Sequence, residues 1–215
     1  MVSRIVRPAW SGKLASICLA LWFAVGLLTQ QAVAASKPQE VAQGFYGVLL
    51  STMRDGRSLG QSGRYARLVP VVNRTFDLAF MARLAVGPSW VTLAPAQRQR
   101  LTDAFGNYVS ATYADRFDTY SGEQLEVTGE RPYGSDVIVQ TKIVKSNGET
   151  TTLNYLMRQN QGAWQISDVY LDGTISQVAV QRSEFSSILR REGVDGLVMA
   201  LSQKVDLLRS VARSS

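Results

Sequence analysis

Hydrophobic residues recur at helical spacing over residues 38–117. The longest periodic stretch covers residues 95–117, where apolar positions follow an i, i+3, i+4, i+7 pattern and Pro95 suits the first position of a helix. Turn residues interrupt the pattern after residue 54, at Pro70 and at Gly87-Pro88. The helices predicted from this pattern span residues 38–53, 64–69, 75–86 and 95–117.

Residues 124–171 have the composition and alternation of β-strands. Strands are predicted over residues 124–130, 136–145, 150–158 and 163–171. Two further helices, over about 177–192 and 194–210, end the chain, and Gly193 suits the position just after the first of them. Four consecutive strands joined by short turns imply an antiparallel meander, so the predicted fold class is α+β, with a four-stranded sheet packed against helices.

The turn at Asn147-Gly148 predicts how two of these strands pair. Both residues tolerate the positive φ of a type I′ turn, and a two-residue turn places Lys142 opposite Leu153 and Gln140 opposite Tyr155. We take the face with most of the aromatic residues as the inner one, although neither face is plainly a solvent face and the opposite choice stays open. The chosen face holds Ile138, Gln140, Lys142, Val144, Leu153, Tyr155, Met157, Trp164, Ile166, Asp168 and Tyr170.

The first 34 residues have the layout of a signal peptide. Arg4, Arg7 and Lys13 precede an uncharged apolar run over residues 14–28, and Ala32-Val33-Ala34 offers a cleavage site. A membrane anchor is the alternative, but a span needs about 20 apolar residues. We therefore predict export to the periplasm, with residues 35–215 as a single mature domain.

Composition narrows the possible partners. The chain of 215 residues is 46% hydrophobic and 19% charged, which fits a folded domain. Removal of residues 1–34 takes away three basic residues and lowers the net charge from +6 to +3, too mild a charge for a nucleic-acid-binding protein. The only cysteine, Cys18, lies in the predicted signal peptide, so the mature protein has no disulfide.

Few residues suggest catalysis. The chain has no histidine, which excludes Ser-His-Asp and Cys-His systems and histidine-containing metal sites, and it has no phosphate-binding glycine motif. We predict no metal and no cofactor. Asp168 could act as a proton-transfer base beside Tyr155 or Tyr170, although a carboxylate in such surroundings is more often a structural acceptor. Asp77 is expected to place a charge in the first turn of its helix.

Several segments together resemble one family. These are Thr75-Phe76-Asp77-Leu78 with Gly87 and Trp90, the long helix from Gln97-Arg98 to Thr112-Tyr113-Ala114, and the C-terminal half with Trp164, Asp168-Val169, Arg182, Phe185, Ile188-Leu189-Arg190 and Gly193-Val194-Asp195-Gly196-Leu197. They resemble the periplasmic phospholipid-carrier family typified by MlaC, also called the toluene-tolerance or ABC-transporter auxiliary family. Asp172-Gly173-Thr174-Ile175-Ser176, and Gln181 before Arg182, depart from the usual pattern, and the stretch Leu171-Asp172-Gly173-Thr174-Ile175-Ser176 is similar to the hopanoid-biosynthesis-associated branch HpnM.

This resemblance implies a fold and a function. The implied fold resembles nuclear transport factor 2, with an added helical lobe and an apolar cavity between sheet and helices. The implied function is that of a non-enzymatic, monomeric carrier that passes a phospholipid or a hopanoid between an inner-membrane transporter complex and an outer-membrane acceptor. The alternative is a small-molecule isomerase or hydratase with Asp168 as base and Tyr155 or Tyr170 as acid.

The candidate site residues follow from the resemblance and from the predicted faces. Arg182, Arg190 and Arg191 are the candidates for docking to a partner or membrane, although a solvated helix face is the more common role of such residues. The candidates for lipid binding are Phe80, Trp90, Ala104, Phe105, Tyr108, Leu153, Tyr155, Met157, Ile166, Tyr170 and Phe185.

Overall fold

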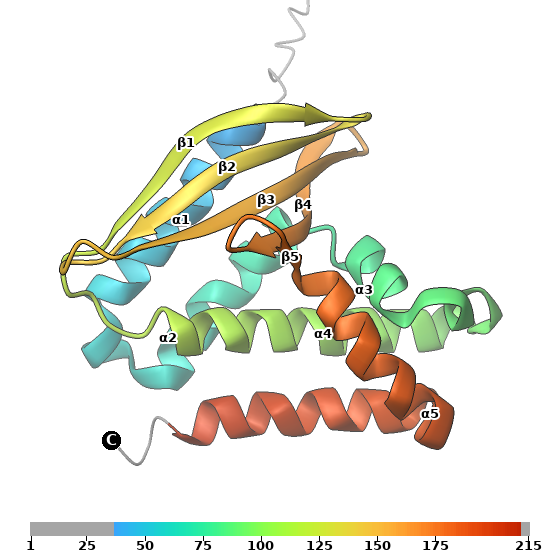
Figure 1. Ribbon diagram of the computed structural model, residues 1–215. Coiled ribbons are helices and arrows are strands. Elements are labelled where there is room, and N and C mark those ends of the chain that lie inside the picture. The colour runs from blue at the N-terminus through green and yellow to red at the C-terminus, as the bar shows by residue number, and fades with distance from the viewer. Residues whose placement is uncertain (1–36, 212–215) are drawn as a thin grey trace, which may run out of the picture. The chain divides into compact units, whose positions relative to one another are not determined.

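Helices flank an antiparallel sheet in the computed structural model, which describes residues 37–211 (Figure 1). The predicted signal peptide and its cleavage site lie outside these residues. The predicted α+β fold with an antiparallel meander is confirmed, and a short fifth strand extends the meander. The elements are α1 (Pro38–Arg54), α2 (Gly56–Thr75), α3 (Leu78–Val86), the 3₁₀-helix η1 (Gly87–Thr92), α4 (Pro95–Arg116), β1 (Gln124–Tyr133), β2 (Asp136–Val144), β3 (Thr150–Asn160), β4 (Ala163–Leu171), β5 (Ile175–Ser176) and α5 (Gln177–Val211).

The helix predictions are correct for α1 and α4 and wrong for the segment between α1 and α3. Pro70 does not end a helix, because α2 continues through it to Thr75. Leu68 and Val72 on either side of Pro70 are fully buried, and this packing outweighs the hydrogen bond that a proline removes. The chain bends at Gly60, where φ is 58°. In α5, Gly193 with a φ of 67° separates two helical halves, as predicted.

The predicted register between β2 and β3 is wrong by one residue. Lys145 N–H donates to the carbonyl of Glu149 (2.8 Å) and Gly148 N–H donates to that of Lys145 (2.9 Å), so three residues form the loop instead of two. Only Gly148 has a positive φ; the Asn147 side chain instead accepts from Glu149 N–H (3.0 Å), which favours the longer loop. Val139 therefore lies opposite Tyr155.

This slip reverses the faces of β2, because alternate residues of a strand point to opposite sides. Val137, Val139, Thr141 and Ile143 share a face with Leu153, Tyr155 and Met157, whereas Ile138, Gln140, Lys142 and Val144 point the other way. In β4 the register shifts between Ile166 and Asp168, so that Ile166 lies opposite Met157 but Val169 lies opposite Tyr155. The inner face therefore combines parts of both predicted faces, and Asp168 and Tyr170 are not on it.

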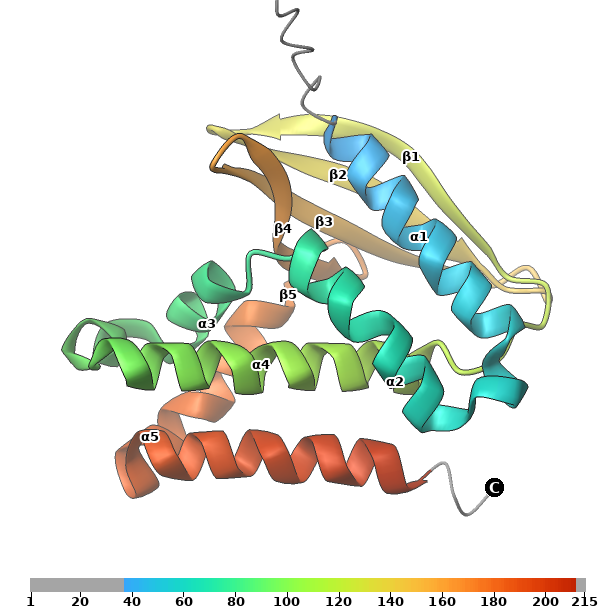
Figure 2. The same ribbon diagram turned by 180° about the vertical axis from the view of Figure 1, so that it is seen from behind.

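Helices cover the inner face of the sheet. The ring of Phe45 in α1 makes edge contacts with the rings of Phe76 (5.3 Å between centroids), Tyr113 (5.1 Å) and Tyr155 (6.3 Å). Figure 2 shows α1 running along the sheet, and both ribbon views show the second half of α5 alongside α4. None of the helices within residues 37–211 is both long and apolar enough to cross a membrane.

Candidate functional site

A pocket of about 370 Å³ opens between the inner face of the sheet and the helices. This volume lies at the lower end of the range of about 300–1,000 Å³ that is typical of small-molecule sites. Its walls come from segments distant in sequence. The lining residues are Met53, Phe76, Met81, Tyr108, Val109, Thr112, Tyr113, Arg116, Phe117, Asp118, Thr119, Glu123, Ile143, Lys145, Thr151, Leu153, Val169, Leu171, Gln177 and Gln181.

The sheet wall of the pocket is the end of the sheet next to the β2–β3 hairpin. Ile143 lies opposite Thr151, and Leu153 lies opposite Leu171. Both pairs face the pocket because of the three-residue hairpin loop and the shift in β4. With the predicted register, Ile143 would have pointed away from Leu153.

The helical wall is mainly one face of α4. Tyr108, Val109, Thr112 and Tyr113 follow helical spacing and border the pocket together. The hydroxyl of Thr112 donates to the carbonyl of Tyr108 (2.8 Å), so its proton is used within the helix. Apart from that hydroxyl and the tyrosine hydroxyls, this wall offers hydrocarbon surface.

Charged residues surround one end of the pocket. Arg116 and Asp118 are exposed at the end of α4, and Lys145 comes from the hairpin. The chain after α4 is fixed against α2, because a β-carbon at Gly56 would overlap the backbone oxygen of Asp118. The buried guanidinium of Arg64 strengthens this junction by donating to the carbonyls of Ala114 (2.9 Å) and Gly56 (3.1 Å).

Asp168 holds the start of α5 and does not border the pocket. It is 6% exposed, and its Oδ1 accepts from the backbone N–H groups of Val169 (2.7 Å) and Val178 (3.1 Å). Its Oδ2 accepts from the hydroxyl of Ser176. Both oxygens are therefore engaged in fixing β5 and α5, which matches the role of a structural acceptor.

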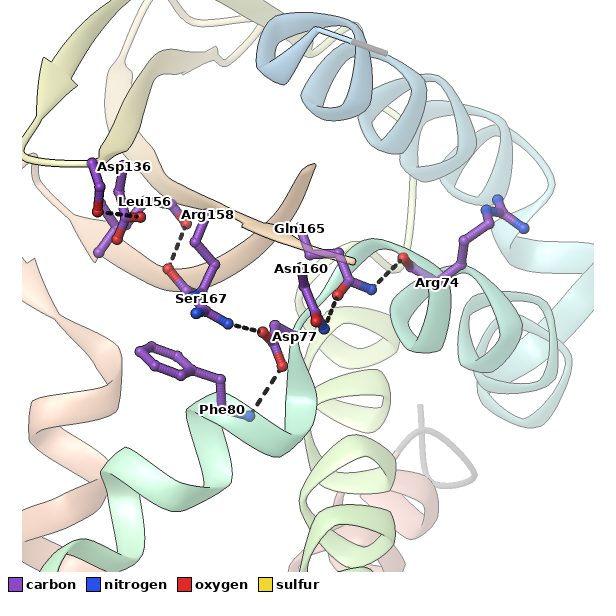
Figure 3. A network of polar contacts seen from close by, with 10 residues as sticks. Arg74, Asp77, Phe80, Asp136, Leu156, Arg158, Asn160, Gln165 and Ser167 are labelled. Carbon is purple, nitrogen blue, oxygen red and sulfur yellow. Dashed lines mark hydrogen bonds and ion pairs between the residues drawn. The ribbon is translucent and has the colours of Figure 1, made fainter. Parts of the chain in front are cut away.

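Asp77 connects α3 to the sheet (Figure 3). One oxygen caps the helix by accepting from Phe80 N–H (3.1 Å), and the other pairs with the guanidinium of Arg158 in β3 (2.6 Å). That guanidinium also lies over the Phe80 ring, 4.1 Å from its centroid. The ring of Phe80, a candidate for lipid binding, thus packs against Arg158 in the contact between α3 and the sheet.

Three buried tyrosines form a row that starts at the pocket wall and continues behind it. Tyr113 lines it, and Tyr155 and Tyr46 follow deeper between α1 and the sheet, with the Tyr46 hydroxyl 2.5 Å from that of Thr141. Burial raises the pKa of all three phenols, and the neighbouring Tyr46 and Tyr113 raise the pKa of Tyr155 further. At neutral pH these groups are uncharged.

The structure brings two of the candidate lipid-binding residues, Tyr108 and Leu153, to the pocket. Most of the others are core residues that are not part of its lining: Trp90, Ala104, Phe105, Tyr155, Met157, Ile166 and Phe185 are at most 9% exposed. Tyr170 lies on the outer face. These residues stay predictions as lipid contacts, and within the described part of the chain no group of acidic or cysteine side chains is arranged to hold a metal.

The candidate docking residues lie along the first half of α5. The guanidinium of Arg182 packs against Gly87, and Arg191 pairs with Glu192 (3.4 Å). Arg190 is about 13 Å along the helix from Gln181, given a rise of ~1.5 Å per residue. Arg190 and Arg191 are not among the residues that line the pocket and lie at the end of the first half of α5, next to the bend at Gly193, so docking through them stays a prediction.

Comparisons with known proteins agree with this geometry. Residues 45–203 match the family model described as MlaC protein. A solved structure of a phospholipid-binding protein from Ralstonia solanacearum, in complex with a phospholipid, aligns with a TM-score of 0.70 and 21% identity over 80% of this chain and 99% of that chain. At that identity the similarity establishes the fold.

Proposed function

Because the chain belongs to the MlaC family, we propose that it is a soluble, non-enzymatic carrier that holds a lipid in the pocket between sheet and helices. Support comes above all from the pocket lining, where apolar residues of α1, α3, α4 and the sheet face one another. The lipid bound by the Ralstonia solanacearum protein makes a phospholipid the first ligand to test. A hopanoid, suggested by the resemblance of residues 171–176 to the HpnM branch, is the second.

Such a carrier needs an apolar interior surface that shields the lipid chain from water. Each buried CH₂ group contributes about 0.8 kcal/mol, so a sixteen-carbon chain in water is disfavoured by roughly 12 kcal/mol on that scale. A wall made of Val109, Leu153 and Leu171 can take over part of that surface without any catalytic group. The engaged oxygens of Asp168 argue against the alternative of an isomerase or hydratase that uses this residue as its base.

The proposal includes a location and partners. The basic and apolar segments of residues 1–34 support export to the periplasm, where a carrier would exchange its cargo with an inner-membrane transporter complex and an outer-membrane acceptor. N-terminal sequencing of the exported protein tests the first point, with Ala35 as the expected first residue. A periplasmic protein that retains residues 1–34 would contradict it.

The decisive experiment identifies the cargo. The full chain is expressed in a bacterium with an outer membrane, the periplasmic protein is purified without detergent, and its organic extract is analysed by mass spectrometry. We expect one lipid class in a near-stoichiometric amount. Protein that carries no lipid when isolated, and that takes up none from vesicles of phospholipid with or without hopanoid, would overturn the proposal.

A further inference from the structure

Arg116 is the only arginine that lines the pocket, and its side chain is exposed at the charged end. It is the last residue of α4 and follows Tyr108 and Thr112, two other lining residues, at a spacing of four. Residues at this spacing share one face of a helix, so Arg116 continues the helical wall of the pocket to its charged end.

The guanidinium of Arg116 has no partner within residues 37–211. It takes part in none of the ion pairs, side-chain hydrogen bonds or cation–π contacts that engage other arginines, such as Arg64, Arg67 and Arg158. An exposed guanidinium at the end of an apolar pocket is therefore free to meet a group that a ligand carries.

The charge of Arg116 acts on the pocket wall. Burial raises the pKa of the Tyr113 phenol, and the positive charge of Arg116 lowers it in part. Tyr113 lines the pocket and precedes Arg116 by three residues, a spacing at which side chains are neighbours on a helix. Since the interaction of two charges weakens with distance, the guanidinium lies near this wall and does not extend away from it.

A second cation reaches the same end from the sheet. Lys145 follows β2 and pairs with Glu149 of its own hairpin (2.8 Å), with side chains that are 53% and 64% exposed. Ion pairs in such exposed positions contribute little stability, so Lys145 can exchange Glu149 for another anion at small cost.

Two acidic residues also border this end. The hydroxyl of Thr119 donates to Asp118 (3.2 Å), and the N–H of Ser121 donates to Glu123 (2.6 Å), so both carboxylates are engaged within their own segment. Their charges offset those of the two cations, and no strong positive field extends from the pocket. A preference for an anion must therefore come from direct contact, for which the planar guanidinium is suited because it can donate to two oxygens at once.

We propose that Arg116 pairs with an oxyanion, a phosphate or a carboxylate, that a bound lipid carries next to its hydrocarbon chain. This inference rests on the proposed function and specifies the class of lipid. The chain lies against the apolar part of the lining, which includes Val109, Leu153 and Leu171, and the oxyanion lies at the charged end. A neutral lipid with the same chain leaves Arg116 without a partner and binds more weakly.

The test measures the binding of two matched pairs of lipids to delipidated protein, by displacement of an uncharged fluorescent lipid. One pair is monopalmitoylglycerol phosphate and monopalmitoylglycerol, and the other is palmitic acid and palmityl alcohol. For the wild type we expect the anionic member of at least one pair to bind roughly fivefold more tightly, the upper size of an ion pair in contact with water. The pair with the larger preference identifies the oxyanion as a phosphate or a carboxylate.

Substitution of Arg116 should remove the preference without weakening the binding of the uncharged lipids. Arg116→Gln should bind both members of each pair about equally. Arg116→Lys should retain part of the preference, because it keeps the charge but loses the forked donor. The wild-type preference should also decrease at high salt, since the contact is accessible to solvent.

The matched control is Arg131→Gln, which removes the same charge at an exposed position of β1. Arg131 lies opposite Ile138 on the outer face of the sheet and does not line the pocket, so this variant should keep the preference. Thermal unfolding of the delipidated variants checks that each is folded.

Three outcomes overturn the inference and leave the proposed function standing. They are an equal preference in wild type and Arg116→Gln, an equal loss in Arg116→Gln and Arg131→Gln, and uncharged lipids that bind the wild type as tightly as both anionic ones. If none of the four lipids binds the wild type, the proposed function fails as well.

Discussion

The two ends of the inner sheet face differ although their residues are similar. At one end Tyr155, Met157 and Ile166 are completely buried and pack with Phe45 and Phe76. At the other end, Leu153, two residues from Tyr155, is partly exposed and borders the pocket. Both ends are apolar, so the strand residues alone do not explain why one end is filled and the other is open.

The helices make the difference. Over the packed end, the ring of Phe45 in α1 packs against the rings of Phe76, Tyr113 and Tyr155. Over the open end, the second half of α4 and the start of α5 supply walls but no side chain that fills the space between them. A cavity in this fold is thus created by the spacing of the helices above an ordinary apolar sheet.

Truncation at the packed end should have the largest effect. Phe45→Ala removes a 2% exposed ring and leaves a cavity among aromatic residues, so we expect a loss of about 3–5 kcal/mol in the free energy of unfolding. Leu153→Ala should lower the free energy of unfolding of the delipidated protein clearly less, because one side of the Leu153 side chain already borders the empty pocket. Chemical denaturation measures both, and equal losses would contradict the contrast between the two ends.

A larger side chain on α4 should affect stability differently at the packed end and at the open end. Ala104 is 9% exposed and packed in the core, so Ala104→Trp should lower the stability of delipidated protein by about 1–3 kcal/mol through overpacking. Thr112, two turns later, borders the pocket, so Thr112→Trp should leave stability nearly unchanged and reduce bound lipid.

Met199→Trp, at a position that is 57% exposed, is the control and should change neither quantity. All comparisons use delipidated protein, because bound lipid stabilises the wild type by mass action. A stable Ala104→Trp variant with a reduced lipid content would instead place the cavity at Ala104, as the sequence predicted.

The smallest expected effect appears only at high pH. The pKa values of Tyr46, Tyr113 and Tyr155 are raised above 10.0 in the folded protein, so the unfolded chain releases these protons first as the pH rises. Their contribution to stability is therefore fully present below about pH 9 and is lost above about pH 10. Denaturation curves at increasing pH should show a shallower decline for Tyr113→Phe than for the wild type, whereas Tyr133→Phe, at a 51% exposed tyrosine, should follow the wild type.

The fold class, most element boundaries and the family could be predicted from the sequence because they depend on local periodicity and on spaced motifs. The pocket could not, because it depends on two single-residue events. The side chain of Asn147 favours a three-residue loop, and an extra residue near Ser167 changes the register of β4. Each event turns a strand segment over, so simple alternation along the sequence places Ile143, Val169 and Leu171 on the wrong face.

Residues from irregular segments were missed for another reason. Phe117, Asp118 and Thr119 follow the last turn of α4, and no periodic signal indicates where such a segment runs. The glycine at position 56 was predicted as part of a turn, and its role in a close backbone approach is visible only in three dimensions. Gln181 departs from the family pattern, but whether its side-chain oxygen has a partner depends on what surrounds it in the fold.

The close approach of Gly56 to Asp118 has a kinetic consequence. With the backbone of α2 pressed against this segment and Arg64 bonded to both sides of the junction, one rim of the pocket is rigid. A ligand can then enter or leave only as fast as the remaining parts of the rim move, at the start of α5 and in the β2–β3 hairpin. We expect cargo residence time to respond to glycine or proline changes in that hairpin and to remain insensitive to tighter anchoring of α2.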